Sequence, residues 1–377
     1  MQDGLVLDLF SECRYVSQDG EAVHYLEIHI VFYLVAFAVS LIVSLFLIPI
    51  LIKVANKYRV YDEPGDRKIH PKSISYLGGF GIYFAVVLGL FAARLLDSTI
   101  HFDPSFFFIL FGMTIIFLNG LGDDLFGYSA NQKFFVQFAI CFAFIDSKGV
   151  IQLYLQELID SYILSRIILS FALVTIINSI NLLDGIDGLA ASMGIFITIV
   201  FAVLNVLQGN DSLAILALSL LGALVGFLYY NFNPAKIFMG DSGALLTGFV
   251  IALLTISTPY KGFVISINHS KIQVINIILA AISFPVFDVI RLFFQRLIAG
   301  ASPFSGDRNH LHHILVDSGV TVVKSVLVIL GIAIAQVLIV VCLPFETWHG
   351  VLFVLIVGYL VILRVISVVV SSLIISK

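Results

Sequence analysis

The sequence predicts an all-α protein that crosses a membrane about eleven times, and three observations carry this prediction. Of the 377 residues, 60% are apolar and only 12% are charged, whereas soluble domains carry about 25% charged residues. The mean hydropathy is +1.08. Apolar runs long enough to cross a bilayer core, roughly 20 residues each, recur along the whole chain. We therefore treat residues 1–377 as a single integral membrane domain.

The apolar runs define the expected spans in order. They lie near residues 30–52, 77–96, 105–121, 132–147, 163–181, 189–207, 212–230, 241–259, 272–293, 321–343 and 350–371. The fourth, which contains "QKFFVQFAICFAFI", is the shortest. The first residues lack the basic segment and apolar core of a cleaved signal, so residues 1–29 are expected to form a short tail. Three cysteines, Cys13, Cys141 and Cys342, give no disulfide framework and no CxxC metal spacing.

The placement of Lys and Arg predicts the orientation. An odd number of spans puts the two termini on opposite sides of the membrane. The loop 53–76 holds six Lys or Arg residues, and Arg296 and Arg308 fall on the same side. Because basic residues are enriched in cytoplasmic loops, we expect the N-terminus outside and the C-terminus in the cytoplasm. The expected location of the protein is the inner (plasma) membrane. The expected cytoplasmic loops, which would form the site, are 53–76, 122–132, 181–188, 231–240 and 294–320.

Acidic residues recur beside glycines on this predicted cytoplasmic side. "GLGDDLFG" contains Asp123 and Asp124, "NLLDGIDG" contains Asp184 and Asp187, and "FMGDSGA" contains Asp241. Carboxylates at membrane depth are costly and repel one another, and a divalent cation removes both costs. Mg²⁺ prefers oxygen ligands and is usually held by one or two carboxylates plus substrate phosphates. We therefore expect Mg²⁺, or alternatively Mn²⁺, bound by Asp241 with Asp124 or Asp123 nearby.

A basic set falls on the same side of the membrane: Lys133, Arg308, His310, His312 and His313. Such donors beside a carboxylate–metal site suit the phosphates of a polyanionic substrate, and glycine-rich turns let main-chain N–H groups approach phosphates closely. Phosphoryl transfer depends mainly on positioning and charge neutralisation. The combination predicts a phosphotransferase whose site can meet a soluble phosphodonor and a lipid phosphate.

Each acidic motif also has a simpler interpretation. Asp123 and Asp124 could form a solvated helix end, and Asp241 could be the N-cap of the eighth span. The segment with Asp184 and Asp187 could be a capped turn, and the two side chains would share a face if it were helical. All these glycine-flanked acids nevertheless fall on the side that Lys and Arg select independently, which favours a common site.

Other features of the sequence also admit alternatives. His312 and His313 could belong to a structural zinc site, but adjacent residues of a helix point about 100° apart and no cysteine accompanies them. Asp288 and Arg291, three residues apart, could form a buried ion pair. A secondary transporter or a lipid-linked sugar flippase is the alternative function. Transporters keep carboxylates near the midplane, often in repeated halves, whereas these acids lie at one face without an internal repeat.

Several motifs resemble a known family. "GLGDDLFG", "NLLDGIDGLA", "NFNPAKIFMGDSGALLTGF", "DRNHLHHIL" and "RKIHPKSISYLGG" are similar to motifs of the polyprenyl-phosphate N-acetylhexosamine-1-phosphate transferases, in the family's order over about residues 55 to 315. The resemblance implies an eleven-span fold, a UDP-N-acetylhexosamine donor, a polyprenyl (undecaprenyl) phosphate acceptor, Mg²⁺ or Mn²⁺, and release of UMP. "HLHH" after "DR" resembles the branch that transfers N-acetylglucosamine-1-phosphate, or a related sugar phosphate, for O-antigen, common-antigen or teichoic-acid linkage units. The Pro-rich stretch of the peptidoglycan branch is absent.

The resemblance also implies roles for individual residues. The nucleotide-sugar pocket would be lined by Asn181, Asp184, Asp187, Asn231 and Phe238. Amides and carboxylates can read the edges of uracil, and an aromatic ring can stack on it. The expected partners are the UDP-sugar, the polyprenyl phosphate and membrane lipid. No nucleic acid is expected as a partner, and the sequence leaves open whether the protein forms a homodimer.

Asp123 and Asp124 are the expected catalytic pair. The lipid phosphate is expected to attack the β-phosphorus directly while Asp123 removes any remaining proton. Prior attack by an aspartate is the alternative. Some family members carry a third acid three residues after this pair, where this chain has Gly127, so the resemblance does not supply that carboxylate.

Overall fold

A computed structural model describes residues 21–61, 74–96, 104–148, 159, 161–259, 264–267, 270–302, 308–343, 345 and 347–375. Most of the predicted tail, residues 1–20, lies outside these ranges. So do residues 62–73 and 303–307 of two predicted loops.

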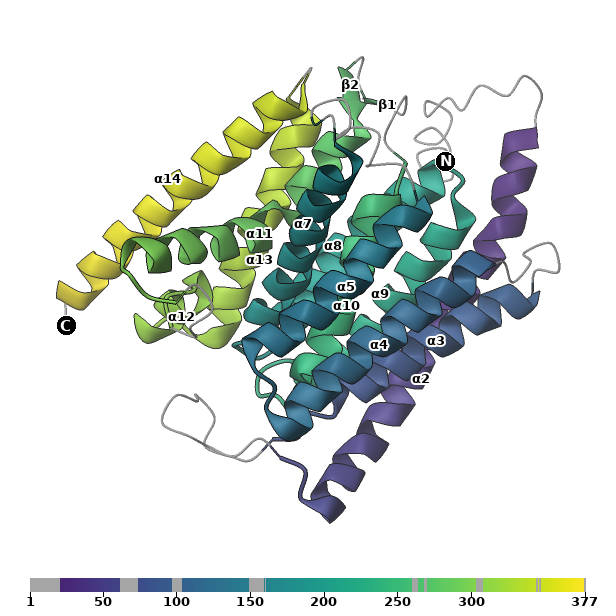
Figure 1. The fold of residues 1–377 in the computed structure, drawn as a ribbon, viewed down its shortest axis with the longest axis horizontal. Helices are drawn as coiled ribbons and strands as arrows, with labels where there is room; N and C mark the ends of the chain where they lie inside the picture. The colour runs from purple at the N-terminus through teal and green to yellow at the C-terminus, as the bar shows by residue number, and fades with distance from the viewer. Residues whose placement is uncertain are drawn as a thin grey trace, which may run out of the picture.

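The chain forms a bundle of long helices with one short β-hairpin (Figure 1). The helices are α2 (Glu21–Tyr58), α3 (Gly78–Leu96), α4 (Pro104–Phe126), α5 (Ala130–Lys148), α7 (Tyr162–Leu183), α8 (Leu189–Leu207), α9 (Asp211–Asn231), α10 (Gly240–Ser257), α11 (Val274–Ile298), α12 (Leu311–Asp317), α13 (Val322–Cys342) and α14 (Trp348–Ile375). In the described part of the chain, ten helices are long and apolar enough to cross a membrane. The remaining expected span, the fourth in order, is α5, whose apolar part, Ala130–Ile145, is shorter. The prediction of an all-α polytopic membrane protein is confirmed.

Several boundaries differ from those expected from sequence. Helix α2 includes residues 21–29 of the expected tail and residues 53–58 of the first expected loop, and α12 lies within the expected loop 294–320. Helix α4 continues to Phe126, so Asp123 and Asp124 lie in its last turns and not in a loop that begins at 122. Gly127, at φ 66°, ends the helix and donates its N–H to the Asp123 carbonyl at 2.8 Å, as glycine C-caps do. The antiparallel hairpin of β1 (Val264–Ile267) and β2 (Ser270–Gln273) was not predicted.

Helix α10 lies at the centre of the bundle, with 83% of its span buried. Two glycine contacts bring its neighbours to backbone distance. A Cβ at Gly120 of α4 would lie 2.5 Å from the Ser242 Cα, and a Cβ at Gly248 of α10 would lie 2.6 Å from the Ile177 carbonyl oxygen of α7. Side chains at these glycines would force the helices apart. Helix α10 is therefore packed closely against both α4 and α7.

One end of this bundle collects the predicted site segments. Helices α4, α7 and α9 end there, and α5, α8 and α10 begin there. We call this end the site face; in Figure 1 it is the lower side, with α12, whereas the β-hairpin lies at the opposite, upper side. The acids that the sequence places at helix ends are therefore brought to a common surface.

Candidate active site at one end of the bundle

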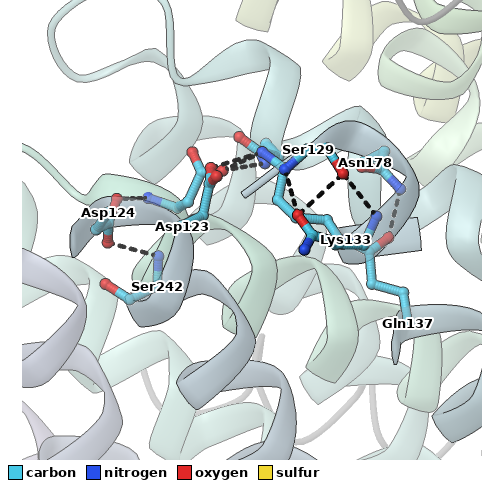
Figure 2. Close-up of polar contacts among 10 residues, drawn as sticks. Asp123, Asp124, Ser129, Lys133, Gln137, Asn178 and Ser242 are labelled. Atoms are coloured by element: carbon cyan, nitrogen blue, oxygen red, sulfur yellow. Dashed lines mark hydrogen bonds and ion pairs between the residues drawn. The ribbon is translucent and has the colours of Figure 1, made fainter. Parts of the chain in front are cut away.

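Asp123 and Asp241 share one cation, the ammonium group of Lys133. Its Nζ donates to Asp123 Oδ2 at 2.7 Å and to Asp241 Oδ2 at 2.6 Å (Figure 2). Asn181 Nδ2 lies 3.4 Å from the same Asp241 oxygen. Helices α4, α5, α7 and α10 thus each contribute one polar side chain to this contact, as the predicted convergence of Asp123, Lys133, Asn181 and Asp241 requires.

The local sequence "SANQK" explains why Lys133 is held in place. Ser129 Oγ accepts the main-chain N–H of Gln132 at 3.3 Å, and Gln132 Oε1 accepts the main-chain N–H of Ser129 at 2.8 Å. This reciprocal pair is a capping box, which fixes the first turn of a helix. Figure 2 shows Ser129 beside Lys133. The turn that carries Lys133 is therefore held by local contacts as well as by the salt bridges.

Asp124 caps α10 from a different helix. Its Oδ1 accepts the N–H of Asp241 at 2.8 Å, and its Oδ2 accepts the N–H of Ser242 at 3.0 Å. A carboxylate at a helix N-terminus satisfies unpaired N–H groups and complements the helix dipole. The interpretation of Asp241 as an N-cap is therefore wrong. Because Asp124 takes that role, the Asp241 side chain is free to face Lys133.

Asp187 and Asn231 tie together the two segments expected to line the nucleotide-sugar pocket. Asp187 Oδ2 accepts from Asn233 Nδ2 at 3.0 Å and from the main-chain N–H of Ala235 at 2.9 Å. Asn231 Oδ1 accepts the N–H of Gly188 at 3.1 Å. The segment around Asp187 is a turn and not helical, so Asp187 does not share a helical face with Asp184.

Phe238 is placed by its main chain. Its N–H donates to the Ser75 carbonyl at 2.7 Å, and its carbonyl accepts the N–H of Gly78 at 3.0 Å. A Cβ at Gly78 would lie 2.4 Å from that carbonyl oxygen, so glycine is required for this approach. The half-buried ring of Phe238 is thereby held on the loop that leads into α10.

Asp184 differs from the other site acids of the described chain. It ends α7 as its C-cap, it is half-buried, and its carboxylate has no hydrogen-bond partner within the part of the chain that the structure describes. Burial, followed by the negative charges of Asp241, Asp124 and Asp187, raises its pKa well above the ordinary range. One lysine therefore faces more carboxylates than it can neutralise, which marks a place for added positive charge.

His312 connects the histidine segment to the acidic turn. A Cβ at Gly185 would lie 2.4 Å from His312 Nε2 and 3.2 Å from His313 Nε2. His312 is buried, and neither ring nitrogen has a hydrogen-bond partner among the described residues. Burial, followed by the neighbouring imidazoles of His313 and His310, lowers its pKa to about 3. At neutral pH the ring is uncharged, with one donor and one acceptor to offer.

The other two members of the predicted phosphate set point elsewhere. His310 Nδ1 lies 2.8 Å from Asp288 Oδ2, and Arg291 Nη2 donates to Asp288 Oδ1 at 2.7 Å, so the expected Asp288–Arg291 ion pair is confirmed. Arg308 is exposed and forms an ion pair with Asp317 at 2.6 Å. This ion pair does not include a member of the carboxylate cluster.

The donor set fits a hard divalent cation better than zinc. Among the described residues, no three His, Cys, Asp or Glu side chains form a ready-made metal site. The oxygens of Asp123 and Asp241 nevertheless already face one cation, the Lys133 ammonium. Carboxylate oxygens are the ligands that Mg²⁺ prefers. These two side chains are therefore the ones suited to hold it.

Sequence reasoning missed an amide pair one helical turn below the cluster. Asn178 Nδ2 donates to Gln137 Oε1 at 2.6 Å (Figure 2). Gln137 is fully buried and follows Lys133 by four residues, and Asn178 precedes Asn181 by three. Amides at helical spacing from a site residue, inside otherwise apolar spans, were the available signal.

Comparisons with known proteins agree with these motifs. The family model of glycosyl transferase family 4 matches residues 106–258. The chain is 33% identical over 299 residues, 78% of its length and 80% of the relative's, to a probable undecaprenyl-phosphate N-acetylglucosaminyl 1-phosphate transferase of Bacillus subtilis (strain 168). It is 30% identical over 294 residues (70% and 72%) to a decaprenyl-phosphate N-acetylglucosaminephosphotransferase of Mycobacterium leprae (strain TN). It is also 28% identical over 290 residues (71% and 72%) to the undecaprenyl-phosphate alpha-N-acetylglucosaminyl 1-phosphate transferase of Escherichia coli (strain K12).

The bundle, its polar end and these relatives together define a membrane-embedded transferase. The chain belongs to glycosyl transferase family 4, among the polyprenyl-phosphate N-acetylhexosamine-1-phosphate transferases. The predicted family and the prediction of an enzyme are confirmed, and the transporter alternative is set aside.

Proposed function

We propose that this enzyme transfers N-acetylglucosamine-1-phosphate from UDP-N-acetylglucosamine to a polyprenyl phosphate such as undecaprenyl phosphate, and releases UMP. The printed names of the relatives support the sugar phosphate and the lipid acceptor. The density of Lys and Arg supports a cytoplasmic site face. The product would start a cell-surface glycan, such as an O-antigen, common antigen or teichoic-acid linkage unit.

The observation that carries the proposal is the contact of Lys133 with both Asp123 and Asp241. It combines a place for a cation with an amine that can meet a phosphate. In our assignment Asp241 holds Mg²⁺ or Mn²⁺ with Asp123 beside it, and Asp124 orients the first turn of α10. When bound, the metal supplies neutralisation of the diphosphate charge.

The remaining residues are assigned to the donor. Lys133 and the neutral imidazole of His312 donate to phosphate oxygens. Asn181 and Asp184 line the space for the nucleotide sugar. Asp187, Asn231 and Phe238 form and brace its wall through the main-chain contacts described above. His313 is assigned to the diphosphate or the lipid phosphate as well, whereas Arg308 and His310, which contact Asp317 and Asp288, belong to the same basic segment and support it.

The reaction is a direct displacement. A lipid phosphate oxygen forms a bond to the β-phosphorus, the bond from that phosphorus to the bridging oxygen breaks, and UMP leaves with the bonding electrons. Because the second pKa of a phosphomonoester is about 6, the lipid phosphate is largely dianionic at neutral pH. Asp123 therefore removes a proton from only a minor fraction, and charge placement supplies most of the rate.

The test uses purified enzyme, polyprenyl phosphate and a panel of UDP-sugars. We expect UMP release with UDP-N-acetylglucosamine that requires both lipid phosphate and Mg²⁺ or Mn²⁺. Lys133→Met should abolish it, whereas Lys324→Met, at the start of α13, is the matched control. Release of UMP without lipid acceptor, or no release with any UDP-sugar, would contradict the proposal.

A second experiment separates direct attack from an aspartyl intermediate. Delipidated enzyme is incubated with UDP-sugar and labelled UMP. Direct attack predicts no label in UDP-sugar, because the reverse step needs the lipid product. Labelled UDP-sugar would instead show that an aspartate attacks first.

A further inference from the structure

Asp288 is a buried carboxylate that receives donors from three separate segments. It is 2% exposed. Arg291 Nη2 of the same helix and Tyr359 Oη of α14 donate to Oδ1 at 2.7 and 2.9 Å. His310 Nδ1 lies 2.8 Å from Oδ2. A single side chain thus connects α11, the last helix and the segment that precedes α12.

The hydrogen bond to Asp288 sets the tautomer of His310. An ionised carboxylate can only accept, so Nδ1 must carry a proton. The state of one ring nitrogen fixes what the other can offer, and Nε2 is therefore the atom left for other partners. Arg291 Nη2 also donates to the Asn309 carbonyl at 2.8 Å, so the main chain beside His310 is held as well.

From His310 the contacts lead to the acidic turn. The rings of His310 and His312 are stacked, with centroids 5.5 Å apart and planes at 20°. His312 Nε2 lies against Gly185, between Asp184 and Asp187. The orientation of the His310 ring therefore limits where the His312 ring can lie against the turn.

We propose that Asp288 is a positioning residue for the transfer reaction. It fixes the tautomer and the orientation of His310, and through the ring stack it sets His312 against the acidic turn. Tyr359 extends this support to α14, so the C-terminal helix contributes to the active site. The proposal rests on the function proposed above, in which the histidine segment meets phosphate.

A double-mutant cycle of Asp288→Asn with His310→Ala tests the link. We expect Asp288→Asn to lower kcat by about 10- to 100-fold, as when the hydrogen-bond partner of a functional histidine is lost, with a smaller change in KM. In the His310→Ala background the same change should cost less than about twofold, because coupled residues are not additive. Equal losses in both backgrounds would make Asp288 a structural residue and overturn the proposal. Tyr359→Phe, a milder change, should follow the same pattern.

Asp211→Asn is the matched control. Asp211 begins α9, at the end of the bundle opposite the site face. It also lies beside a histidine and a tyrosine: His29 Nδ1 is 3.2 Å from its Oδ2, and the Tyr33 hydroxyl donates to Oδ1. Loss of this carboxylate should lower the melting temperature and leave kcat and KM unchanged.

A measurement without turnover separates this proposal from the proposed function. In ¹⁵N-histidine NMR of the full-length protein, the resonance removed by His310→Ala identifies His310. We expect a protonated Nδ1 in the wild type and an altered state in Asp288→Asn. A bare Nδ1 in the wild type would overturn the positioning role, whatever the enzyme transfers. Loss of UMP release with this NMR signature intact would instead count against the proposed reaction.

Discussion

The carboxylate cluster and the surroundings of Asp288 differ in how completely their negative charges are compensated. In the carboxylate cluster, Asp123 and Asp241 share Lys133, while Asp184 has no hydrogen-bond partner in the described chain. Around Asp288, one carboxylate receives three donors. A buried charge that lacks compensation is costly, whereas a fully hydrogen-bonded one rigidifies its surroundings. The incomplete cluster is suited to bind something, and the complete one is suited to hold other residues in place.

Asp241→Asn is the substitution with the largest expected effect, and it tests the role of the incomplete cluster. It removes a charge from the cluster that is assigned to cation and phosphate chemistry. We expect kcat to fall by about 100-fold or more, while the protein still inserts and purifies as a monodisperse species. Wild-type activity of this variant at limiting Mg²⁺ would remove Asp241 from the metal site.

Asp184→Asn separates stability from activity. The raised pKa of Asp184 means that the folded protein holds the proton more tightly than the unfolded chain. The penalty for ionising Asp184 therefore grows as pH rises above the unfolded value of about 4 and disappears below it. In metal-free protein at neutral pH, Asp184→Asn should raise the melting temperature while lowering UMP release. An advantage in melting temperature that persists unchanged at low pH would contradict this account.

His312→Leu sharpens the comparison from the histidine side. Its pKa of about 3 lies below the unfolded value near 6.5, so the unfolded chain binds the proton more readily between these values. His312 therefore destabilises the wild type progressively as pH falls from 6.5 toward 3, by at most about 1.4 kcal/mol per pH unit. Thermal unfolding of the wild type and the variant should show that the difference between their melting temperatures narrows as the pH rises toward 7. Parallel curves would mean that His312 is not buried in its neutral form.

The smallest expected effect is that of Ser129→Ala. It removes one half of the capping box and should cost about 1 kcal/mol of stability. Because Lys133 keeps both carboxylate partners, kcat should fall only a few-fold. A loss as large as that of Lys133→Met would show that the cap, and not the salt bridges, holds the lysine. Melting curves and UMP release on the same preparation distinguish these outcomes.

The sequence was sufficient for the spans and for the segments of the site. Apolar runs specify helices in a membrane because main-chain groups must be satisfied within the segment, and the acids at their ends are visible as interruptions. The fourth apolar run is the shortest in the sequence, and the corresponding helix, α5, has a shorter apolar part than the ten candidate spans.

The sequence did not indicate which acid does what. Asp123 and Asp124 are adjacent and chemically identical, yet one faces Lys133 and the other caps α10. That division depends on the approach of α4 to α10 at Gly120, a packing contact between residues distant along the chain. The partners of Asp288 were hidden for the same reason, since Tyr359 lies 71 residues away on the last helix.

The packing of α10 between α4 and α7 has a consequence for biosynthesis. The chain leaves the ribosome from its N-terminus, so α4 and α7 enter the bilayer before α10 exists. Until α10 arrives, Asp124 has no helix end to cap, and the surfaces at Gly120 of α4 and Ile177 of α7 have no helix to pack against. The histidine segment is made later still. A nascent chain is therefore inert, and the catalytic apparatus is completed only when most of the protein has been synthesised.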